Sequence, residues 1–382
     1  MPYDFDTVTD RSGTFSYKWD IAQGELPMWV ADMDFRTAPE IIAAFEERVR
    51  HGVFGYIIVP DEWRDAYIGW WRERHGVKYS REELIFATGV IPILSSCVRK
   101  LTTPAENVVV LTPVYNVFFN CIFNNGRNIR KVELDYSGGK YSIDFDRLKE
   151  ALADPQTTLM IFSNPHNPAG IIWDKETLAR VGELAYDNGV TVISDEIHCD
   201  LTDPDYEYVP FASVSEKCRD NCVVCVSPTK AFNLAGLQTA AAIVPNPRLR
   251  HKVWRALNTD EAAEPNSFAV QAAIAAFTKG GEWLDALREY LAENKRIAAE
   301  FIAANLPAIK PVASNATYLM WLDCNALSDD PHALAEHIRK TTGLFLSDGS
   351  IYGGSGCFLR MNIACPKAML YDGLDRLKRA LM

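Results

Sequence analysis

Residues able to do chemistry follow five short apolar runs of this sequence, each close to the point where its run ends. They supply a Thr-Gly turn, an aromatic ring, an amide, a carboxylate with an imidazole, and a hydroxyl with an amine. Helix starts bind phosphate, carboxylates stabilise protonated ring nitrogens, and amines condense with aldehydes. In chain order the groups belong to Gly89 with Val90 and Ile91, to Tyr115, to Asn167, to Asp195 with His198, and to Ser227 with Lys230.

The apolar runs themselves are typical of strands in one sheet. Helix-length segments separate most of them, such as 174–188, which Asp174 can cap and Gly189 can end. This alternation predicts an α/β fold with a mostly parallel seven-stranded sheet and helices on both faces. Ligands of such sheets bind beyond the carboxyl ends of the strands, where the five groups would suit pyridoxal 5′-phosphate (PLP), a phosphorylated aromatic aldehyde. The runs cover 84–87, 107–112, 129–134, 159–163, 190–194, 222–227 and 239–244.

After residue 245 the alternation of apolar runs and helix-length segments ends. Residues 281–306 carry apolar side chains at helical spacing, which predicts a long amphipathic helix. The segments 317–322 and 357–363 are typical of strands, and 331–342 and 366–381 of helices. We therefore expect an N-terminal arm with part of a small domain over 1–45, a large PLP-binding domain over 46–280, and a small α+β domain over 281–382.

Composition and charge favour a small-molecule enzyme. The 382 residues are 48% hydrophobic and 23% charged, which excludes collagen-like, coiled-coil and disordered chains. The 39 basic and 50 acidic residues give a net charge of −11, so nucleic acid is not expected as a partner. Apolar runs are too short to cross a membrane, and the start MPYDFDTVTD is unlike a signal peptide. Nine cysteines without such a signal favour reduced thiols and a cytoplasmic location.

Several motifs resemble those of known PLP enzymes. SPTKAFNLAGL, NPHNPAG, SDEIH and FLRMN look like the fold-type I enzymes of the class I/II aminotransferase superfamily. YDFDTVTDRSGTFSYKWD, LPMWVADMDF, HGVFGY and ATYLMWLD resemble the MalY/PatB branch, the carbon–sulfur lyases similar to cystathionine β-lyase. The resemblance runs from about residue 3 to 365 and implies a fold-type I PLP-dependent transferase fold.

The resemblance gives each matched residue near the cofactor ring a role. Lys230 would bond to the PLP aldehyde and later move the Cα proton of the substrate. Asp195 would keep the pyridine nitrogen protonated, which makes the ring an electron sink. Asn167 and His198 would approach the phenolic oxygen, and Tyr115 would lie on the ring face.

The phosphate would be bound at a helix start. Gly89, Val90 and Ile91 would offer backbone N–H groups and Ser227 a hydroxyl. Eight residues after the lysine, aminotransferase relatives usually carry a phosphate-binding arginine, whereas this sequence has Gln238. That departure weakens a plain aminotransferase interpretation.

Two matched residues lie outside the strand ends. Arg360, in FLRMN, resembles the arginine that binds the substrate α-carboxylate from the small domain. Tyr56, in HGVFGY, resembles the tyrosine that reaches the cofactor phosphate of the neighbouring subunit. The resemblance therefore implies a homodimer with shared active sites.

The activity implied is β-elimination at the Cβ–S bond of an amino-acid substrate such as L-cystathionine, L-cysteine or a related S-substituted cysteine. Its products would be a thiol, pyruvate and ammonia. Either Lys230 or Tyr56 could protonate the leaving thiol. An aminotransferase is the first alternative, and a regulatory protein on the same scaffold is the second.

Other patterns do not support a site. Cys218, Cys222 and Cys225 have the C-x₃-C-x₂-C spacing of an iron–sulfur motif, but a strand over 222–227 would point the last two to opposite faces. The sequence 195–198, DEIH, resembles a helicase box without its phosphate loop. The acid-rich stretch 195–205 could suggest a metal, but successive loop residues rarely converge, so no metal is expected.

Overall fold

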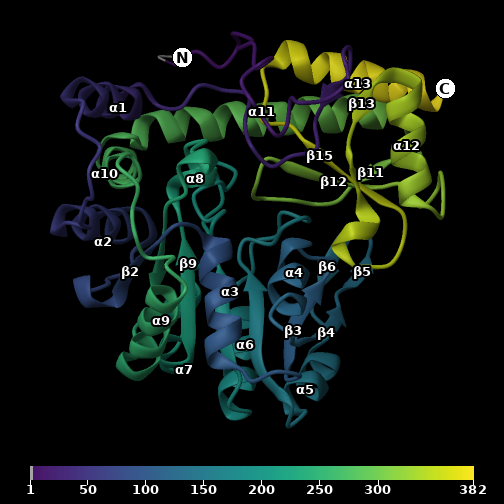
Figure 1. The fold of residues 1–382 in the computed structure, drawn as a ribbon. Coiled ribbons are helices and arrows are strands. Elements are labelled where there is room, and N and C mark those ends of the chain that lie inside the picture. Colours follow the sequence, from purple (N-terminus) through teal and green to yellow (C-terminus); the bar gives the residue numbers. More distant parts are fainter. Residues whose placement is uncertain (1–2) are drawn as a thin grey trace.

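The computed structural model describes residues 3–382, so the first two residues of the predicted N-terminal arm lie outside the described part of the chain. Its central feature is a seven-stranded sheet in the order β2-β10-β9-β8-β7-β3-β4 (Figure 1). Each strand coincides with one of the predicted apolar runs, which confirms the predicted α/β sheet. The strands are β2 (Leu84–Ala87), β3 (Asn107–Thr112), β4 (Asn128–Glu133), β7 (Thr157–Ser163), β8 (Thr191–Asp195), β9 (Cys222–Val226) and β10 (Ala240–Ile243).

One strand of the sheet reverses direction. The strands β9, β8, β7, β3 and β4 are parallel, whereas β10 is antiparallel to both β9 and β2. Val226 at the end of β9 pairs with Ala241 at the start of β10, so the connection 227–239 stays at the carboxyl edge of the sheet. This connection contains the short helix α8 (Pro228–Ala231) and therefore holds Lys230 at the same edge as the end of β8.

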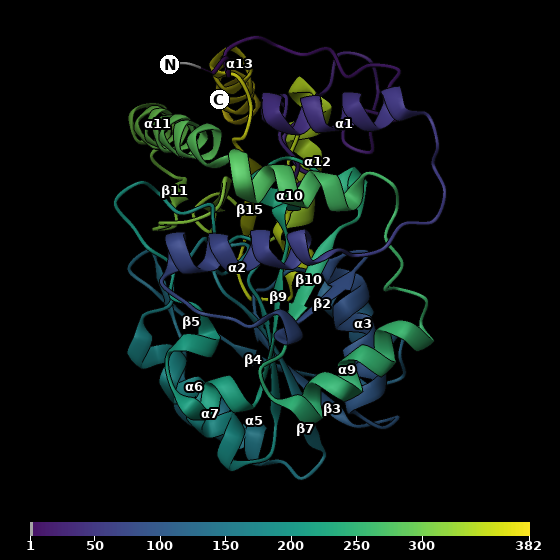
Figure 2. The ribbon, with the colours of Figure 1, turned by 90° about the vertical axis from the view of Figure 1, so that its left-hand side faces the viewer.

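Each face of the sheet has its own core, because successive strand residues point to opposite sides. Val110 of β3 lies in one core with Leu94, and the neighbouring Val109 lies in the other with Leu178. Figure 2 shows α3 and α9 on one side of the sheet and α6 and α7 on the other. The first core includes α3 (Val90–Leu101), α4 (Val117–Phe123) and α9 (Pro247–Thr259), and the second α5 (Phe145–Ala153), α6 (Lys175–Asp187) and α7 (Glu216–Asp220).

The predicted helix over 174–188 is α6. Asp174 is its N-cap and accepts a hydrogen bond from the backbone N–H of Thr177 at 2.7 Å. The strand position of the cysteines also agrees with prediction: Cys222 and Cys225 lie in the two different cores, and all nine cysteines are buried and free.

A stack of three helices, not predicted from the sequence, covers one end of the sheet. Figure 2 shows α1, α10 and α2 one above another. The aromatic side of α2 (Trp63, Tyr67 and Trp71) is buried in the same core as Phe86 of β2. The three helices are α1 (Pro39–His51), α2 (Asp61–His75) and α10 (Ala269–Lys279).

The C-terminal part forms a smaller α+β unit above the large sheet (Figure 1). Its antiparallel sheet has the order β11-β12-β15-β14, and its helices match the predicted segments. Strand β1 (Leu26–Pro27) pairs with β13 (Leu344–Phe345), which brings the N-terminal segment against this unit. The remaining elements are β5 (Asp135–Ser137), β6 (Lys140–Ser142), α11 (Gly281–Asn305), β11 (Lys310–Pro311), β12 (Leu319–Asp323), α12 (Pro331–Thr342), β14 (Ser347–Asp348), β15 (Phe358–Asn362) and α13 (Lys367–Leu381). Across residues 3–382, no helix is both long and apolar enough to span a bilayer.

Candidate active site

A cavity of about 310 Å³ lies at the carboxyl edge of the large sheet. Most of the residues predicted from the strand ends meet there, although their positions run from 89 to 230 in the sequence. Polar groups and backbone from the starts of α3 and α8 form its walls. The predicted residues that line it are Gly89, Val90, Ile91, Tyr115, Asn167, Asp195, His198 and Lys230.

The start of α3 forms one wall of the cavity. Gly89 is the N-cap of this twelve-residue helix, and Val90 is its first residue. A Cβ atom added at Gly89 would lie 3.2 Å from Cδ of Pro92, so a larger residue would crowd the turn. Helix starts carry free N–H groups and a partial positive charge. This wall can therefore bind an anion such as a phosphate.

Lys230 extends from α8 toward the N-terminal segment. Its Nζ donates a hydrogen bond to the carbonyl oxygen of Ala31 at 2.5 Å. Burial lowers the pKa of Lys230 to about 8, and the positive charge of Arg360 adds to this effect while Asp32 and Asp195 oppose it. The amine is therefore much easier to deprotonate than an ordinary lysine, which suits a nucleophile or a base.

Asp195 ends β8 inside the cavity. Its side chain is 7% exposed, and burial raises its pKa to about 7. One carboxylate oxygen accepts a hydrogen bond from the backbone N–H of Ile197 at 3.2 Å, and the charge of Lys230 favours the ionised form. A buried carboxyl group of this kind ionises readily when a cationic ring nitrogen is placed against it.

His198 is a neutral imidazole in the cavity wall. Burial lowers its pKa to about 3, and the charges of Lys230 and Arg360 act in the same direction. Within residues 3–382 its Nδ1 has no hydrogen-bond partner. The His198 ring lines the cavity, so a ligand there meets an imidazole that carries no charge.

Asn167 and Arg360 are joined directly. Nη1 of Arg360 donates to Oδ1 of Asn167 at 3.1 Å, and Nη2 donates to the carbonyl oxygen of Trp29 at 3.0 Å. The guanidinium is 5% exposed and lies 5.0 Å from the centre of the Tyr352 ring. These contacts fix the position of the Arg360 guanidinium. Because Asn167 uses its oxygen for this bond, the Nδ2 hydrogens of Asn167 can donate to a ligand.

Known proteins share both the sequence and the fold of this chain. The family model for aminotransferase class I and II matches residues 26–377. The chain belongs to this family. It is 43% identical to cystathionine β-lyase PatB of Bacillus subtilis and 33% identical to protein MalY of Escherichia coli, over 99% of each chain in both cases. Its structure matches cystalysin of Treponema denticola, which contains a PLP cofactor, with a TM-score of 0.96 and 32% identity over 100% of this chain and 99% of that chain.

Three residues predicted for this aminotransferase-family site do not line the cavity itself: Arg360, which reaches Asn167 in the cavity wall, Ser227 and Tyr56. Ser227 caps α8: its hydroxyl donates to the carbonyl oxygen of Thr239 at 2.6 Å and accepts from the backbone N–H of Thr229 at 3.1 Å. Its hydroxyl proton is therefore already used, and the hydroxyl is not free to donate to a phosphate. Tyr56 is fully exposed, in the segment between α1 and α2.

The cavity also contains residues to which the sequence analysis gave no role at the site. Ala31 contributes its carbonyl oxygen, and Thr88 and Thr229 precede predicted residues by one position. Ala31 lies in the motif LPMWVADMDF at 26–35, but the methyl side chain of alanine indicates no chemical role. Gln238, noted as a departure from the relatives, lines the cavity as well, in a left-handed conformation with φ of 53°.

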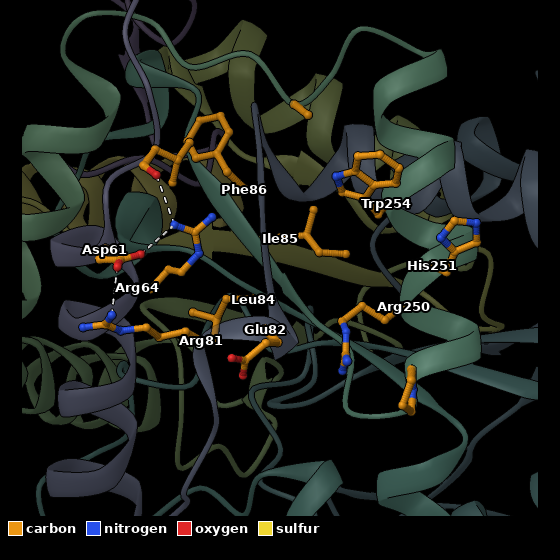
Figure 3. Close-up of a pocket in the computed structure, with 13 residues that line it drawn as sticks. Asp61, Arg64, Arg81, Glu82, Leu84, Ile85, Phe86, Arg250, His251 and Trp254 are labelled. Atoms are coloured by element: carbon orange, nitrogen blue, oxygen red, sulfur yellow. Dashed lines mark hydrogen bonds and ion pairs between the residues drawn. The ribbon is translucent and has the colours of Figure 1, made fainter.

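A larger hollow of about 710 Å³ lies elsewhere, between α2, β2 and α9 (Figure 3). Two of its arginines already have partners: Arg81 pairs with Asp61 at 2.8 Å, and Arg64 donates to the carbonyl oxygen of Val59 at 3.1 Å. The hollow includes none of the predicted catalytic or cofactor-binding residues. The smaller cavity at the strand ends is therefore the candidate active site.

Proposed function

We propose that this protein is a PLP-dependent carbon–sulfur β-lyase. Its substrates would be L-cystathionine, L-cysteine or related S-substituted cysteines, and its products a thiol, pyruvate and ammonia. The full-length similarity to cystathionine β-lyase PatB supports this assignment. The observation that carries it is the meeting of Lys230 and Asp195 in one cavity with a helix start.

The residues of the cavity fit PLP. The volume of about 310 Å³ accommodates a phosphorylated pyridine ring, and the start of α3 suits the phosphate. The imidazole of His198 lies in the same wall as the amide of Asn167, so both side chains can face the phenolic oxygen. Asp195, with a pKa near 7, would face the ring nitrogen, and Tyr115 would lie on the ring.

When bound, PLP supplies an electron-withdrawing ring that delocalises the charge left at the substrate Cα after the proton is removed. The protein has to place and move that proton. Lys230, with its lowered pKa, would take it from Cα, and Arg360 would hold the substrate α-carboxylate so that the Cα–H bond faces the amine. Lys230 or Tyr56 would then protonate the leaving thiol.

An aminotransferase would use the same residues to remove the same proton. The two activities differ in the next step, because the lyase expels the group on Cβ whereas the aminotransferase keeps it. Incubation of the purified enzyme with L-cystathionine separates them. Release of pyruvate without an added keto acid supports the lyase, and a strict requirement for a keto acid would show that the enzyme is an aminotransferase.

The assembly and location of the enzyme are part of the same proposal. Tyr56 is exposed beside other exposed apolar side chains, Val53, Phe54 and Ile58, as expected if this segment contacts a second subunit and completes its site. We propose a cytoplasmic homodimer with an arm over 1–45, a large domain over 46–280 and a small domain over 281–382. A regulatory role on this scaffold would be separable from catalysis in a Lys230→Ala variant.

A further inference from the structure

A second cluster of chemically active side chains lies beside the active site. His75 ends α2, while Cys199 and Asp200 lie in the turn after β8. One ligand atom from each residue lies within 4.8 Å of the other two. Cys199 and Asp200 are 2% and 5% exposed. The cluster is therefore a compact set of a nitrogen, a sulfur and an oxygen donor in a largely dry place.

Hydrogen bonds and ring contacts hold these donors in position. Oδ1 of Asp200 accepts from Nε1 of Trp70 and contacts Nε2 of His75, each at 2.9 Å. Both contacts fall on the same carboxylate oxygen, Oδ1. The His75 ring lies 4.9 Å from the Tyr208 ring, edge to face. The contacts from Trp70 and Tyr208 come from outside the three donor residues, and such outer contacts are what orient the ligands of a metal site.

A cavity of about 190 Å³ gives access to the cluster. The exposed Glu207 lies in its wall and can supply a further oxygen. Two guanidinium groups also line the cavity, but each has another partner: Arg74 pairs with Asp285, and Arg288 donates to the carbonyl oxygen of Thr202 at 2.9 Å. The carbonyl end of helix α2, where His75 lies, favours a positive charge.

We propose that His75, Cys199 and Asp200 bind a zinc ion, with Glu207 or a water molecule in the fourth position. Zinc accepts mixed nitrogen, sulfur and oxygen ligands in a tetrahedron, at about 2.0–2.3 Å from the metal, and donor atoms so placed lie within the 4.8 Å that the cluster shows. As the Zn–S bond forms, the thiol proton passes to solvent. Magnesium and calcium prefer oxygen ligands alone.

A cysteine nucleophile is the other chemistry that these three residue types can perform. Cys199 is 2% exposed, so an organic substrate has little access to its sulfur. A metal ion is small enough to lie among donor atoms that are within 4.8 Å of one another.

The zinc ion would join two segments that are far apart in the sequence. His75 and Asp200 are separated by 125 positions, and Cys199 directly follows the active-site residue His198. The ion would thus fix the end of α2 to the turn that carries His198. The pattern of the stretch 195–205 does not by itself indicate this site, because the proposed nitrogen ligand, His75, comes from another helix.

Titration of the tag-free holoenzyme with Co²⁺, as a spectroscopic substitute for zinc, tests the proposal. We expect one Co²⁺ per chain, with the intense d–d absorption of tetrahedral cobalt at wavelengths longer than the absorption of PLP, and its loss when Zn²⁺ is added. Cys199→Ser should abolish this spectrum, and His75→Ala should weaken Co²⁺ binding at least about 10-fold, a loss of the size expected even for a group that only supports a metal ligand.

The matched control is Cys218→Ser, which removes another buried thiol and should leave cobalt binding unchanged. A tetrahedral signal that persists in Cys199→Ser, or a parent enzyme that binds no Co²⁺ and no Zn²⁺ by calorimetry, would overturn the proposal. If Cys199→Ser does not fold by circular dichroism, the result with His75→Ala decides in its place.

Discussion

Nη1 of Arg360 donates a hydrogen bond to Oδ1 of Asn167 at 3.1 Å. Arg360 lies on β15 of the small sheet, and Asn167 follows β7 of the large sheet. A group proposed to bind the substrate and a group proposed to bind the cofactor are thus in direct contact. Because the guanidinium is buried, its loss should lower the affinity for the substrate. It should also change the pKa of the neighbouring Lys230.

Replacing Arg360 with alanine should therefore mainly raise KM. A charge-assisted pair with a carboxylate contributes about 1.5–3 kcal/mol, which corresponds to a rise of roughly 10- to 150-fold. The charge of Arg360 also lowers the pKa of Lys230, so the pH–rate profile of the variant should move to higher pH. Steady-state kinetics across pH test both effects, and Arg360→Lys should recover part of the affinity. Parent-like kinetics would show that Arg360 does not bind the carboxylate.

Lys230→Ala should abolish turnover while the fold persists. Loss of a positioned acid–base group costs about 10²- to 10⁴-fold in rate, and the variant would also lose its covalent bond to PLP. The visible absorbance of the lysine-bound cofactor should disappear. In the parent, borohydride reduction followed by peptide mapping should find the modification at position 230. Lys217→Ala, at the surface, is the control and should behave like the parent.

The large sheet was predictable because its strands are continuous apolar runs that end at polar, chemically distinct residues. The helices α1, α2 and α10 were not predicted. In α2 the buried side is built from tryptophan and tyrosine among charged residues, so its apolar periodicity is weak. The reversed direction of β10 was also missed, since it depends on how the segment 227–239 turns and not on the type of any residue in it.

Some residues of the candidate site could likewise be predicted from the sequence, and others could not. Lys230, Asp195, Asn167 and His198 could be named in advance because their side chains carry the chemistry. Ala31 could not, because it contributes a backbone carbonyl that any residue would provide. The capping bonds that occupy Ser227 were likewise invisible, since they depend on the position of the Thr239 carbonyl.

Asp195→Asn should change how the stability of the cofactor-free protein depends on pH. Burial raises the folded-state pKa of Asp195 from 3.8 to about 7, so the folded form holds its proton more tightly than the unfolded form. The resulting stability is fully present below pH 3.8 and is lost as pH rises to about 7. Asparagine does not titrate, so the variant should lack this loss.

Urea unfolding of both proteins between pH 4 and 7 measures the effect. The free energy of unfolding of the variant, relative to the parent, should increase with pH across this range, and titrating groups that do not interact with Asp195 cancel in the comparison. A flat difference for Asp195→Asn would mean that the pKa of Asp195 is not raised in the folded protein.

Gly170→Ala should destabilise the protein more than Gly189→Ala. Both glycines have a left-handed conformation, with φ of 65° and 68°, so alanine costs about 1–2 kcal/mol at either position. A Cβ atom at Gly170 would also lie 2.1 Å from Oγ of Ser314 and 2.5 Å from the carbonyl oxygen of Ala316, whereas at Gly189 it meets nothing within 4 Å. Overpacking adds about 1–3 kcal/mol. Equal losses in urea unfolding would contradict this account.

Mixing two inactive variants should restore activity if Tyr56 completes the site of a second subunit. Tyr56→Ala and Lys230→Ala dimers would each lack one essential group in every site. After exchange of subunits, about half of the dimers are hybrids, and each hybrid has one site with both groups intact, so activity should recover to about one quarter of the parent value. The hybrid dimers can be isolated with two different affinity tags and assayed with L-cystathionine. Because the side chain of Tyr56 is fully exposed in the single chain, an active Tyr56→Ala enzyme, or hybrids without activity, would show that each subunit works with its own residues alone.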